Sequence, residues 1–459
     1  MTMALAAVMA GTLGGEVLGL PFLAIAAGLA SVAYIVLAFP RVGYTGRGFI
    51  VLAAGLAAAL FASAPDAPGD VAKALARACL VVTLFNALGF LREAARGSAV
   101  VRRCGYFLTR QPPGRRYLAL TLGGHLFGLV LSYGSISLLG TMSERANARE
   151  RDPVVRRLRL RRMLLAIQRG FVGTLTWSPL GLSMAVTLAT FPELSWEKVL
   201  PFFLLSGFIL VVLGWALDRM FKPTGRASSL GRERAEGSWL LLAPIAGLVG
   251  AIFLGAILFR ETLRVSMVMG VIVAVPLAAA LWILWQFAGR GPGRAVALAA
   301  RRLARHMGRA FPADRGEIVI LWSAGFIGTL VASLLKAHGL AAFPEILPEA
   351  PWLLPVACLW LIAAAGQLGM NPILSVTILG SALPDLHALG LAPASVAVAF
   401  TAGWALSGAS SPFTATTMLV GRIGGARAVT VGLGWNGVYT LLALVSISLL
   451  VAAMATFGP

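Results

Sequence analysis

The chain has 459 residues, of which 58% are hydrophobic and only 12% are charged. Ordinary soluble domains carry about 25% charged residues, so this composition argues strongly against a water-soluble fold. The net charge of +20 comes mainly from arginines in short blocks between apolar runs. That placement is typical of topology signals in a membrane protein and does not favour nucleic-acid binding.

The long apolar runs are predicted to be membrane-spanning helices. Each holds about the 17 to 25 residues that a helix needs to cross the hydrocarbon core. None alternates apolar and polar residues as a barrel strand does, and amides in hydrocarbon must be paired within the segment. The predicted fold class is therefore an all-α polytopic membrane protein. Its spans are expected at residues 17–39, 48–63, 74–91, 163–190, 199–217, 239–259, 265–287, 317–335, 394–420 and 429–457.

The first half, residues 1–217, contains one segment that a straight helix does not explain. Lys and Arg collect in cytoplasmic loops, and the basic stretches 92–116 and 144–162 flank the apolar segment 117–142 on both sides. Two full spans would need about forty residues, and the segment contains flexible Gly and Ser residues. It is predicted to be a re-entrant hairpin that enters from the cytoplasm. The alternative is a single span with one basic loop on the outer side.

The second half, residues 239–459, follows a basic cytoplasmic linker at 218–238. Its segment 352–383 lies between the weakly charged loop 336–349 and Asp385, so it is predicted to be a hairpin that enters from outside. Each half then has about five transmembrane helices and one hairpin. Because that number of spans is odd, the halves have opposite orientations, as in an inverted repeat.

The two halves also align in residues. Gln168 to Met184 aligns without gaps on Thr401 to Thr417 at one separation (403 − 170 = 233 and 412 − 179 = 233). The hairpins align at nearly the same separation (375 − 135 = 240 and 366 − 124 = 242). Matches of Gly, Ala and Leu are common in apolar sequence, so the shared Ser-Pro element carries most of the weight. The main pairs are Gly170 with Gly403, Ser178-Pro179 with Ser411-Pro412, Gly124-His125 with Gly366-Gln367, and Ser135–Gly140 with Ser375–Gly380.

Each aligned span is expected to be a helix broken at its Ser-Pro element, in 163–190 and in 394–420. A proline inside a helix costs about 3 kcal/mol, and in a membrane the break persists only where protein or a water-filled cavity satisfies the freed groups. The half-helix after each break would point free amides and its positive dipole end into the gap. The breaks are therefore predicted to lie side by side and to bind an anion. The alternative is that their Ser and Thr hydroxyls only bond the preceding turn.

This layout resembles the ion transporter superfamily, which includes divalent anion/sodium symporters, citrate and C4-dicarboxylate carriers and the membrane subunits of TRAP transporters. The resemblance covers nearly the whole chain in architecture but only the hairpins and breaks in residues. It implies a mobile domain of hairpin tips and broken helices that carries substrate past a scaffold by an elevator motion, in a homodimer. The Ser-Asn-Thr signature of the sodium-coupled dicarboxylate symporters is absent. The chain therefore looks like a divergent member, and neither a dicarboxylate substrate nor sodium coupling follows.

Candidate site residues follow from the breaks and from this resemblance. The substrate-binding set is Thr176, Ser178, Pro179, Ser183, Asn371, Ser375, Ser410, Ser411, Pro412, Thr414, Thr416 and Thr417, and the coupling-ion or hairpin set is His125, Ser135, Ser137, Gln367 and Thr377. His125 is interpreted either as a proton carrier or as a neutral side chain bonded to a backbone carbonyl. The sequence shows no HExxH, no intramembrane carboxylate pair, no metal-ligand cluster and no phosphate loop. No enzyme, metal site or cofactor is predicted.

The predicted function is secondary active transport of a small organic anion across the inner (cytoplasmic) membrane. Its expected partners are the lipid bilayer and the anionic substrate, with Na⁺ or H⁺ as the coupling ion. The alternative is a membrane flippase or an envelope-assembly subunit that handles a lipid-linked or polymeric substrate, with the basic loops docking anionic head groups.

Overall fold

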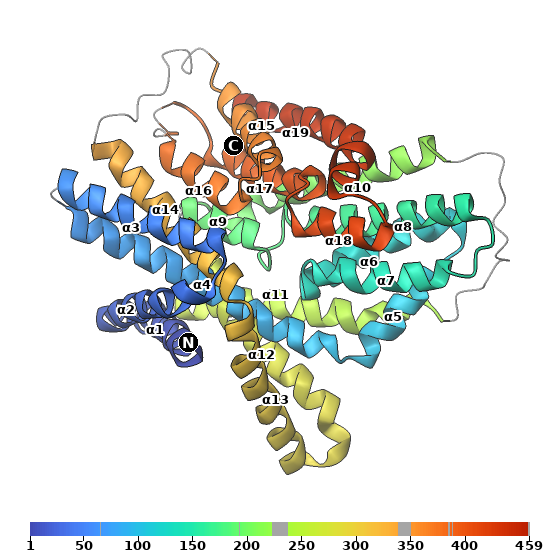
Figure 1. Ribbon diagram of the computed structural model, residues 1–459, viewed down its shortest axis with the longest axis horizontal. Coiled ribbons are helices and arrows are strands. Elements are labelled where there is room, and N and C mark those ends of the chain that lie inside the picture. The colour runs from blue at the N-terminus through green and yellow to red at the C-terminus, as the bar shows by residue number, and fades with distance from the viewer. Residues whose placement is uncertain are drawn as a thin grey trace.

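The computed structural model describes residues 1–64, 66–191, 193–222, 237–337, 350–383, 386–387 and 389–457. Every regular element in these ranges is a helix (Figure 1). Eight of the described helices are long and apolar enough to cross a membrane. They correspond to the unbroken spans predicted from the sequence, and the all-α polytopic membrane fold is confirmed. Most of the predicted linker 218–238 and of the loop 336–349 lies outside the described residues, as does Asp385.

The first half contains the helices α1 to α10. Their bounds are α1 Thr2–Leu18, α2 Pro21–Ala38, α3 Tyr44–Ser63, α4 Ala67–Arg96, α5 Ala99–Thr109, α6 Pro113–Leu131, α7 Gly134–Asn147, α8 Pro153–Thr174, α9 Leu182–Thr190 and α10 Trp196–Met220. A short 3-10 turn, Phe39–Arg41, extends α2.

The second half contains α11 to α19. Their bounds are α11 Ala243–Leu263, α12 Met267–Phe287, α13 Pro292–Ala313, α14 Arg315–Ala337, α15 Leu353–Gln367, α16 Pro372–Ala382, α17 Pro393–Ser410, α18 Ala415–Gly424 and α19 Gly437–Phe457. A π-helical segment, Thr430–Trp435, precedes α19, and 3-10 turns at Trp239–Leu242 and Ala288–Arg290 flank α11 and α12. In Figure 1, α12 and α13 project away from the body that the other helices form.

The first apolar run differs from its prediction, because the single span 17–39 is two helices. Helix α1 ends at Leu18, Gly19 is left-handed with φ 64°, and α2 begins at Pro21. A left-handed Gly after one helix and a Pro in the first turn of the next are standard end and start signals. Helices α1 and α2 lie side by side (Figure 1), so one more apolar helix precedes the first hairpin than the sequence analysis expected.

Both predicted hairpins are pairs of helices joined by a tight turn. Helices α6 and α7 meet at Ser132, which has φ 53°, and α15 and α16 meet through a turn that includes Gly369 with φ 87°. The first hairpin, Pro113–Asn147, is longer than the predicted 117–142, because its basic flanks are helical as well. Entry of the two hairpins from opposite sides of the bilayer stays a prediction.

Both predicted helix breaks are present. Helix α8 ends at Thr174 and α9 starts at Leu182, whereas α17 ends at Ser410 and α18 starts at Ala415. Each second half-helix starts at the third residue after its proline, so the alignment of the halves holds at this point. Ser178 and Ser411, which precede the prolines, are each 1% exposed. The breaks therefore lie inside the protein and do not face lipid.

Aligned glycines bring each hairpin against its broken helix. In the first half α6 packs along α8, and in the second half α15 packs along α17. A methyl group at these positions would meet the facing helix, so glycine permits a close approach. In the first half, Gly124 faces the carbonyl oxygen of Ile167, and Gly170 faces the carbonyl oxygen of Thr121. In the second half, Gly366 faces the hydroxyl of Ser407, and Gly403 faces Ile362 and the carbonyl oxygen of Leu359.

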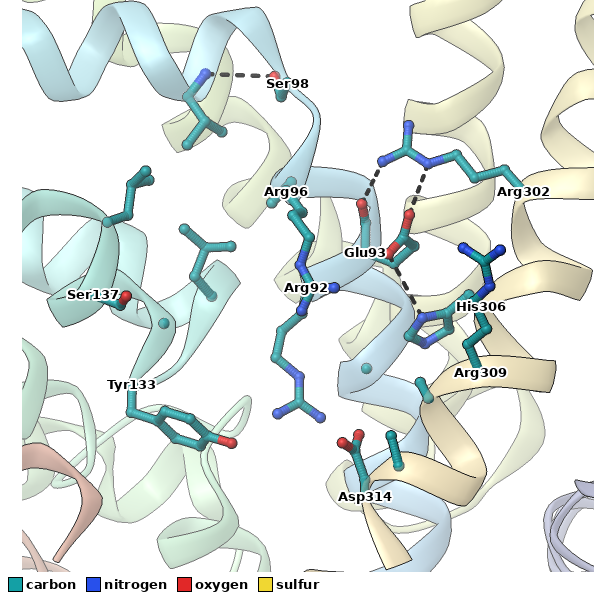
Figure 2. A pocket seen from close by; sticks show the side chains of 18 of the residues that line it. Arg92, Glu93, Arg96, Ser98, Tyr133, Ser137, Arg302, His306, Arg309 and Asp314 are labelled. Atoms are coloured by element: carbon teal, nitrogen blue, oxygen red, sulfur yellow. Dashed lines mark hydrogen bonds and ion pairs between the residues drawn. The ribbon is translucent and has the colours of Figure 1, made fainter. Parts of the chain in front are cut away.

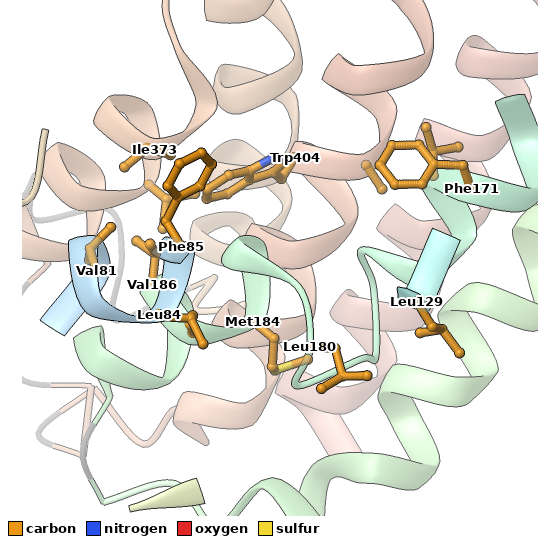
Figure 3. Close-up of a cluster of buried hydrophobic side chains, with 14 of the residues drawn as sticks. Val81, Leu84, Phe85, Leu129, Phe171, Leu180, Met184, Val186, Ile373 and Trp404 are labelled. Atoms are coloured by element: carbon orange, nitrogen blue, oxygen red, sulfur yellow. The ribbon is translucent and has the colours of Figure 1, made fainter. Parts of the chain in front are cut away.

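An apolar core surrounds the breaks (Figure 3). Phe85 of α4 and Ile373 of α16 lie near Trp404 of α17, and Val186 and Met184 of α9 lie beneath them. These helices come from both halves of the chain. The core therefore fixes the breaks of the two halves in one place.

Candidate functional site

A cavity of about 520 Å³ lies between the two hairpin tips and the two breaks. Its wall takes residues from four segments that the sequence analysis singled out. The predicted site residues on this wall are Ser178, Ser183, Asn371, Ser411, Thr414 and Thr416. We call it the central cavity.

The two breaks are neighbours, as predicted. The side-chain amide of Gln168 on α8 donates to the carbonyl oxygen of Ala409 on α17 at 3.2 Å. A Cβ built on Gly408 would lie 3.7 Å from Cδ1 of Leu175. Leu175 and Gly408 are equivalent in the alignment of the halves, and equivalent residues meet only close to a two-fold axis.

Two helices begin at the central cavity from the hairpin tips, α7 and α16, and two more begin there after the breaks, α9 and α18. The side chain of Asn371 caps α16 by accepting from the amide of Ile373 at 2.9 Å. Helices α9 and α18 have no side-chain cap at their N-caps, Gly181 and Thr414. First-turn amides without a cap are available donors, and the positive ends of helix dipoles favour an anion nearby.

The two breaks are built from the same hydrogen bonds. The hydroxyl of Ser178 accepts from the amide of Leu180 at 3.1 Å, and the hydroxyl of Ser411 accepts from the amide of Phe413 at 3.2 Å. These pairs are equivalent in the alignment of the halves. Each serine therefore stabilises the turn at its proline.

A second equivalent bond satisfies a carbonyl that each break releases. The hydroxyl of Ser183 donates to the carbonyl oxygen of Leu175 at 2.6 Å. Its counterpart, Thr416, donates to the carbonyl oxygen of Gly408. A buried carbonyl without a donor would cost about 1 to 3 kcal/mol, so these hydroxyls offset the loss of helical bonds.

The remaining hydroxyls of the second break also donate within the protein. Ser411 donates to the carbonyl oxygen of Gly366 at 2.7 Å, Thr417 to that of Ser411 at 2.6 Å, and Thr414 to that of Ser411 at 3.0 Å. The sequence analysis expected hydroxyls and amides to serve an anion together. In this conformation the hydroxyl protons of Ser183 and of the second break are occupied, whereas Ser178 is seen only as an acceptor. The first-turn amides of α9 and α18 are available as donors.

The other predicted site residues lie away from the cavity wall. Thr176 is buried and donates to Gly173, Ser375 donates to Asn371, and Thr377 donates to Ile373. Ser135 is buried, and its hydroxyl has no partner among the described residues, whereas Ser137 is exposed. Pro179 and Pro412 are not on the wall, and they shape the turns at the breaks.

His125 and Gln367, which the alignment pairs, make equivalent contacts. Nε2 of His125 accepts from the indole N–H of Trp177 at 3.0 Å, and Nδ1 lies 3.2 Å from the carbonyl oxygen of Gly170. Because Nε2 accepts, the proton is on Nδ1 and donates to that carbonyl. The geometry thus matches the neutral, carbonyl-bonded alternative. Nε2 of Gln367 donates to the hydroxyl of Ser410 at 2.8 Å, and Ser410 is the counterpart of Trp177.

Sequence reasoning missed a buried arginine. Arg169 on α8 is 5% exposed, and its guanidinium donates to Oδ1 of Asn436 at 3.0 Å and to the hydroxyl of Tyr117 at 3.3 Å. It also lies 4.4 Å from the ring centre of Tyr439. Asn436 donates in turn to Oε1 of Gln168 at 3.0 Å. A lone Arg within an apolar run was the available signal, because ionisable residues at such positions usually have a role.

Glu317 was also missed as a cavity residue. Its carboxylate accepts from the hydroxyl of Tyr133, at 3.0 Å to Oε1. Tyr133 is at the tip of the first hairpin, and Glu317 is in the first turn of α14. Glu317 is the one carboxylate among the described residues that line the central cavity.

Two broken helices and two hairpins around one cavity are the defining features of this polytopic membrane protein. No protein-family model matches the sequence, and none of the curated proteins matches it. Solved structures do share the fold. The YdaH transporter of Alcanivorax borkumensis superposes with a TM-score of 0.52 at 18% identity, covering 83% of this chain and 85% of that one.

MtrF of Neisseria gonorrhoeae, described as illuminating a class of antimetabolite efflux pumps, superposes with a TM-score of 0.60 at 14% identity, covering 90% of this chain and 96% of that one. At such identities the likeness shows a shared fold. The two structures are described as a transporter and as an efflux pump. The ion transporter superfamily itself stays a prediction.

Proposed function

We propose that the protein is a secondary active transporter that moves a small organic anion across the inner (cytoplasmic) membrane. The observation that carries the proposal is the start of α9 and of α18, both without a side-chain cap, at one cavity. Such amides and dipole ends attract a carboxylate or similar group. Apolar wall residues such as Phe171 and Trp404 would contact the organic part of the substrate.

The transport step in this proposal is an elevator-type motion. The moving unit would comprise both hairpins and both broken helices, α6–α9 and α15–α18, and α3, α4 and α14 would belong to the scaffold. Gln168 supports this division, because its side-chain amide on α8 bonds Ala409 on α17 and so connects the broken helices of the two halves. The bond from Tyr133 to Glu317 would have to open, since it connects a hairpin tip to α14. Assembly as a homodimer is part of the same proposal.

The coupling ion is Na⁺ or H⁺ in this proposal, and Glu317 is the candidate proton carrier. Its carboxylate lines the cavity and accepts a hydrogen bond from Tyr133 at a hairpin tip. The fold shared with an antimetabolite efflux pump favours export over uptake as the direction of transport.

Ala415→Asp tests the anion site. Ala415 lies on the cavity wall in the first turn of α18, so an aspartate there would place a negative charge beside the amides that the substrate needs. Ala415→Asn is the matched neutral control, and Ser446→Ala is a remote control because Ser446 is exposed and bonds only its own helix.

The measurement is a thermal-shift screen of mono-, di- and tricarboxylates on the purified protein, followed by flux of the best anion in proteoliposomes. We expect Ala415→Asp to lower anion affinity at least tenfold, and Ala415→Asn and Ser446→Ala to leave it within about twofold of the wild type. Equal binding by all four proteins would place the anion elsewhere and contradict the proposal.

A further inference from the structure

A second cavity, of about 860 Å³, lies where α4, α5, α7 and α13 meet. Figure 2 shows the α4 residues Arg92 and Arg96 between the hairpin wall, with Tyr133 and Ser137, and the α13 wall, with Arg302 and Arg309. We call this cavity the arginine vestibule and define it by Arg92, Arg96, Arg102, Arg302, Arg305 and Arg309. Its arginines come from the stretch 92–116, which the sequence analysis placed on the cytoplasmic side, and from a second basic stretch, 290–315.

Little of this positive charge is neutralised within the protein. The acidic side chains on the wall are Glu93 and Asp314. Arg302 forms an ion pair with Glu93, in which Nε lies 3.0 Å from Oε1, and it also donates a hydrogen bond to the backbone carbonyl oxygen of Glu93. Arg96, Arg102 and Arg309 form no ion pair with a carboxylate of the described residues. The vestibule therefore has an excess of unpaired guanidinium groups.

His306 adds no charge to this excess at neutral pH. Its ring stacks edge-on against Phe90 and Phe311, and burial lowers its pKa from the usual value although Glu93, at 3.7 Å, opposes the shift. The positive potential thus comes from the arginines, which stay charged at every relevant pH. A cleft lined by one sign of charge concentrates counter-ions of the opposite sign.

The vestibule and the central cavity share two wall residues. Arg92 and Tyr133 line both. Arg92 extends over the ring of Phe85 at 4.7 Å, and Phe85 also lines the central cavity. The bond from Tyr133 to Glu317 lies at the same boundary. The wall residues that separate an anion in the vestibule from the central cavity therefore include Arg92, whose guanidinium is a cation at the boundary.

We propose that the arginine vestibule is a second anion site, which captures a soluble organic anion with two or more negative charges from the cytoplasm before it enters the central cavity. The inference rests on the proposed transport function and adds to it the charge class of the substrate. Separate guanidinium groups on α4, α5 and α13 match separate carboxylates or a phosphate on one ligand, because each can form a two-pronged bond. A monoanion would engage only one of them.

The test is calorimetric binding of citrate, as a trivalent probe, to the full-length protein in nanodiscs of neutral lipid. The variant is the triple substitution Arg96→Gln, Arg102→Gln and Arg309→Gln. The matched control is Arg103→Gln, Arg110→Gln and Arg294→Gln, which removes three exposed arginines outside the vestibule but on or beside the same helices. Both variants lower the net charge equally.

We expect the vestibule triple to weaken citrate binding at least tenfold and the control triple to change it less than threefold. Acetate should bind neither protein measurably at the same ionic strength. Unchanged citrate affinity in the vestibule triple, or an equal loss in both triples, would overturn the proposal. So would binding of anionic lipid by these arginines without any citrate binding in neutral nanodiscs, because the ligand would then be a head group.

Ala415→Asp separates this proposal from the transport proposal. The vestibule is intact in that variant, so citrate should still bind there. If Ala415→Asp has no effect on any anion while the vestibule triple loses citrate, the central anion site is wrong and the vestibule stands. If Ala415→Asp abolishes citrate binding and the vestibule triple does not, the vestibule is wrong and the central site stands.

Discussion

The two hairpins are attached to their broken helices at equivalent positions but by different chemistry. In the first half His125 stacks on Trp177, with ring centres 5.6 Å apart, and forms hydrogen bonds to Trp177 and Gly170. In the second half Gln367 forms one bond to Ser410, and its Oε1 is buried without a partner among the described residues. The fold thus conserves the position of the contact, while the residues that make it differ.

This difference indicates that the first hairpin is held more firmly than the second. Two hydrogen bonds and a stacked ring pair oppose its separation, whereas the second hairpin depends on Gln367 and on the bond from Ser411 to Gly366. An unsatisfied buried acceptor such as Oε1 of Gln367 is a cost that movement or a bound donor would relieve. The second hairpin is therefore the better candidate for a gate.

The largest effect that would test this comparison is expected at the aligned glycines. A methyl group on Gly170 would overlap the carbonyl oxygen of Thr121, which is backbone and cannot rotate away. On Gly403 it would lie 3.0 to 3.2 Å from Ile362 side-chain atoms and 3.1 Å from the carbonyl oxygen of Leu359. Gly170→Ala should cost on the order of 3 kcal/mol and Gly403→Ala about 1 kcal/mol. Thermal unfolding in detergent measures both, and a larger loss for Gly403→Ala would contradict the ranking.

The next effect concerns the two contacts themselves. His125→Ala leaves the buried N–H of Trp177 without an acceptor and removes the stacked ring, so we expect a loss of about 2 to 3 kcal/mol. Gln367→Ala removes one bond to Ser410, whose hydroxyl still donates to Leu406 at 2.8 Å, and should cost about 1 kcal/mol or less. Differential scanning calorimetry of the purified variants ranks their losses of stability. Equal losses of stability would show that the two hairpins are attached to their broken helices with equal strength.

Local residue signals explain why the two helix pairs and the two helix breaks could be predicted. Pro179 and Pro412 remove helical hydrogen bonds wherever they stand, and a glycine such as Gly369 accepts the positive φ of a tight turn. The division at Gly19 and Pro21 followed the same rules but fell inside a continuous apolar run, which was interpreted as one span. Hydropathy alone does not reveal such a break.

The rest of the site depends on contacts between residues far apart in the sequence. Arg169 bonds Asn436, and Tyr133 bonds Glu317 across the two halves. No local pattern indicates such partners, because they are set by how helices from the two halves pack. The same holds for Ser183 and Thr416: their type suggested ligand binding, and only the fold shows that their protons serve freed carbonyls.

The smallest predicted effect decides between hydroxyls and amides as the anion donors. Ser183→Ala removes the bond to Leu175 and should cost about 1 kcal/mol of stability, since that carbonyl loses its hydroxyl donor. Thr416→Val should cost less, because the hydroxyl of Thr414, 3.3 Å from the carbonyl oxygen of Gly408, can turn to it from that of Ser411, which Thr417 also serves. Neither change alters the first-turn amides of α9 or α18.

If the amides bind the anion, both variants should keep its affinity within about twofold despite the loss of stability. If the hydroxyls turn toward the ligand in the bound state, each variant loses a charge-assisted bond worth about 1.5 to 3 kcal/mol, which is more than a tenfold loss of affinity. Binding of the best anion from the carboxylate screen, measured below the unfolding range of each variant, separates the two. A tenfold loss in Ser183→Ala alone would assign the anion to the first break and make the two halves unequal in binding as well as in attachment.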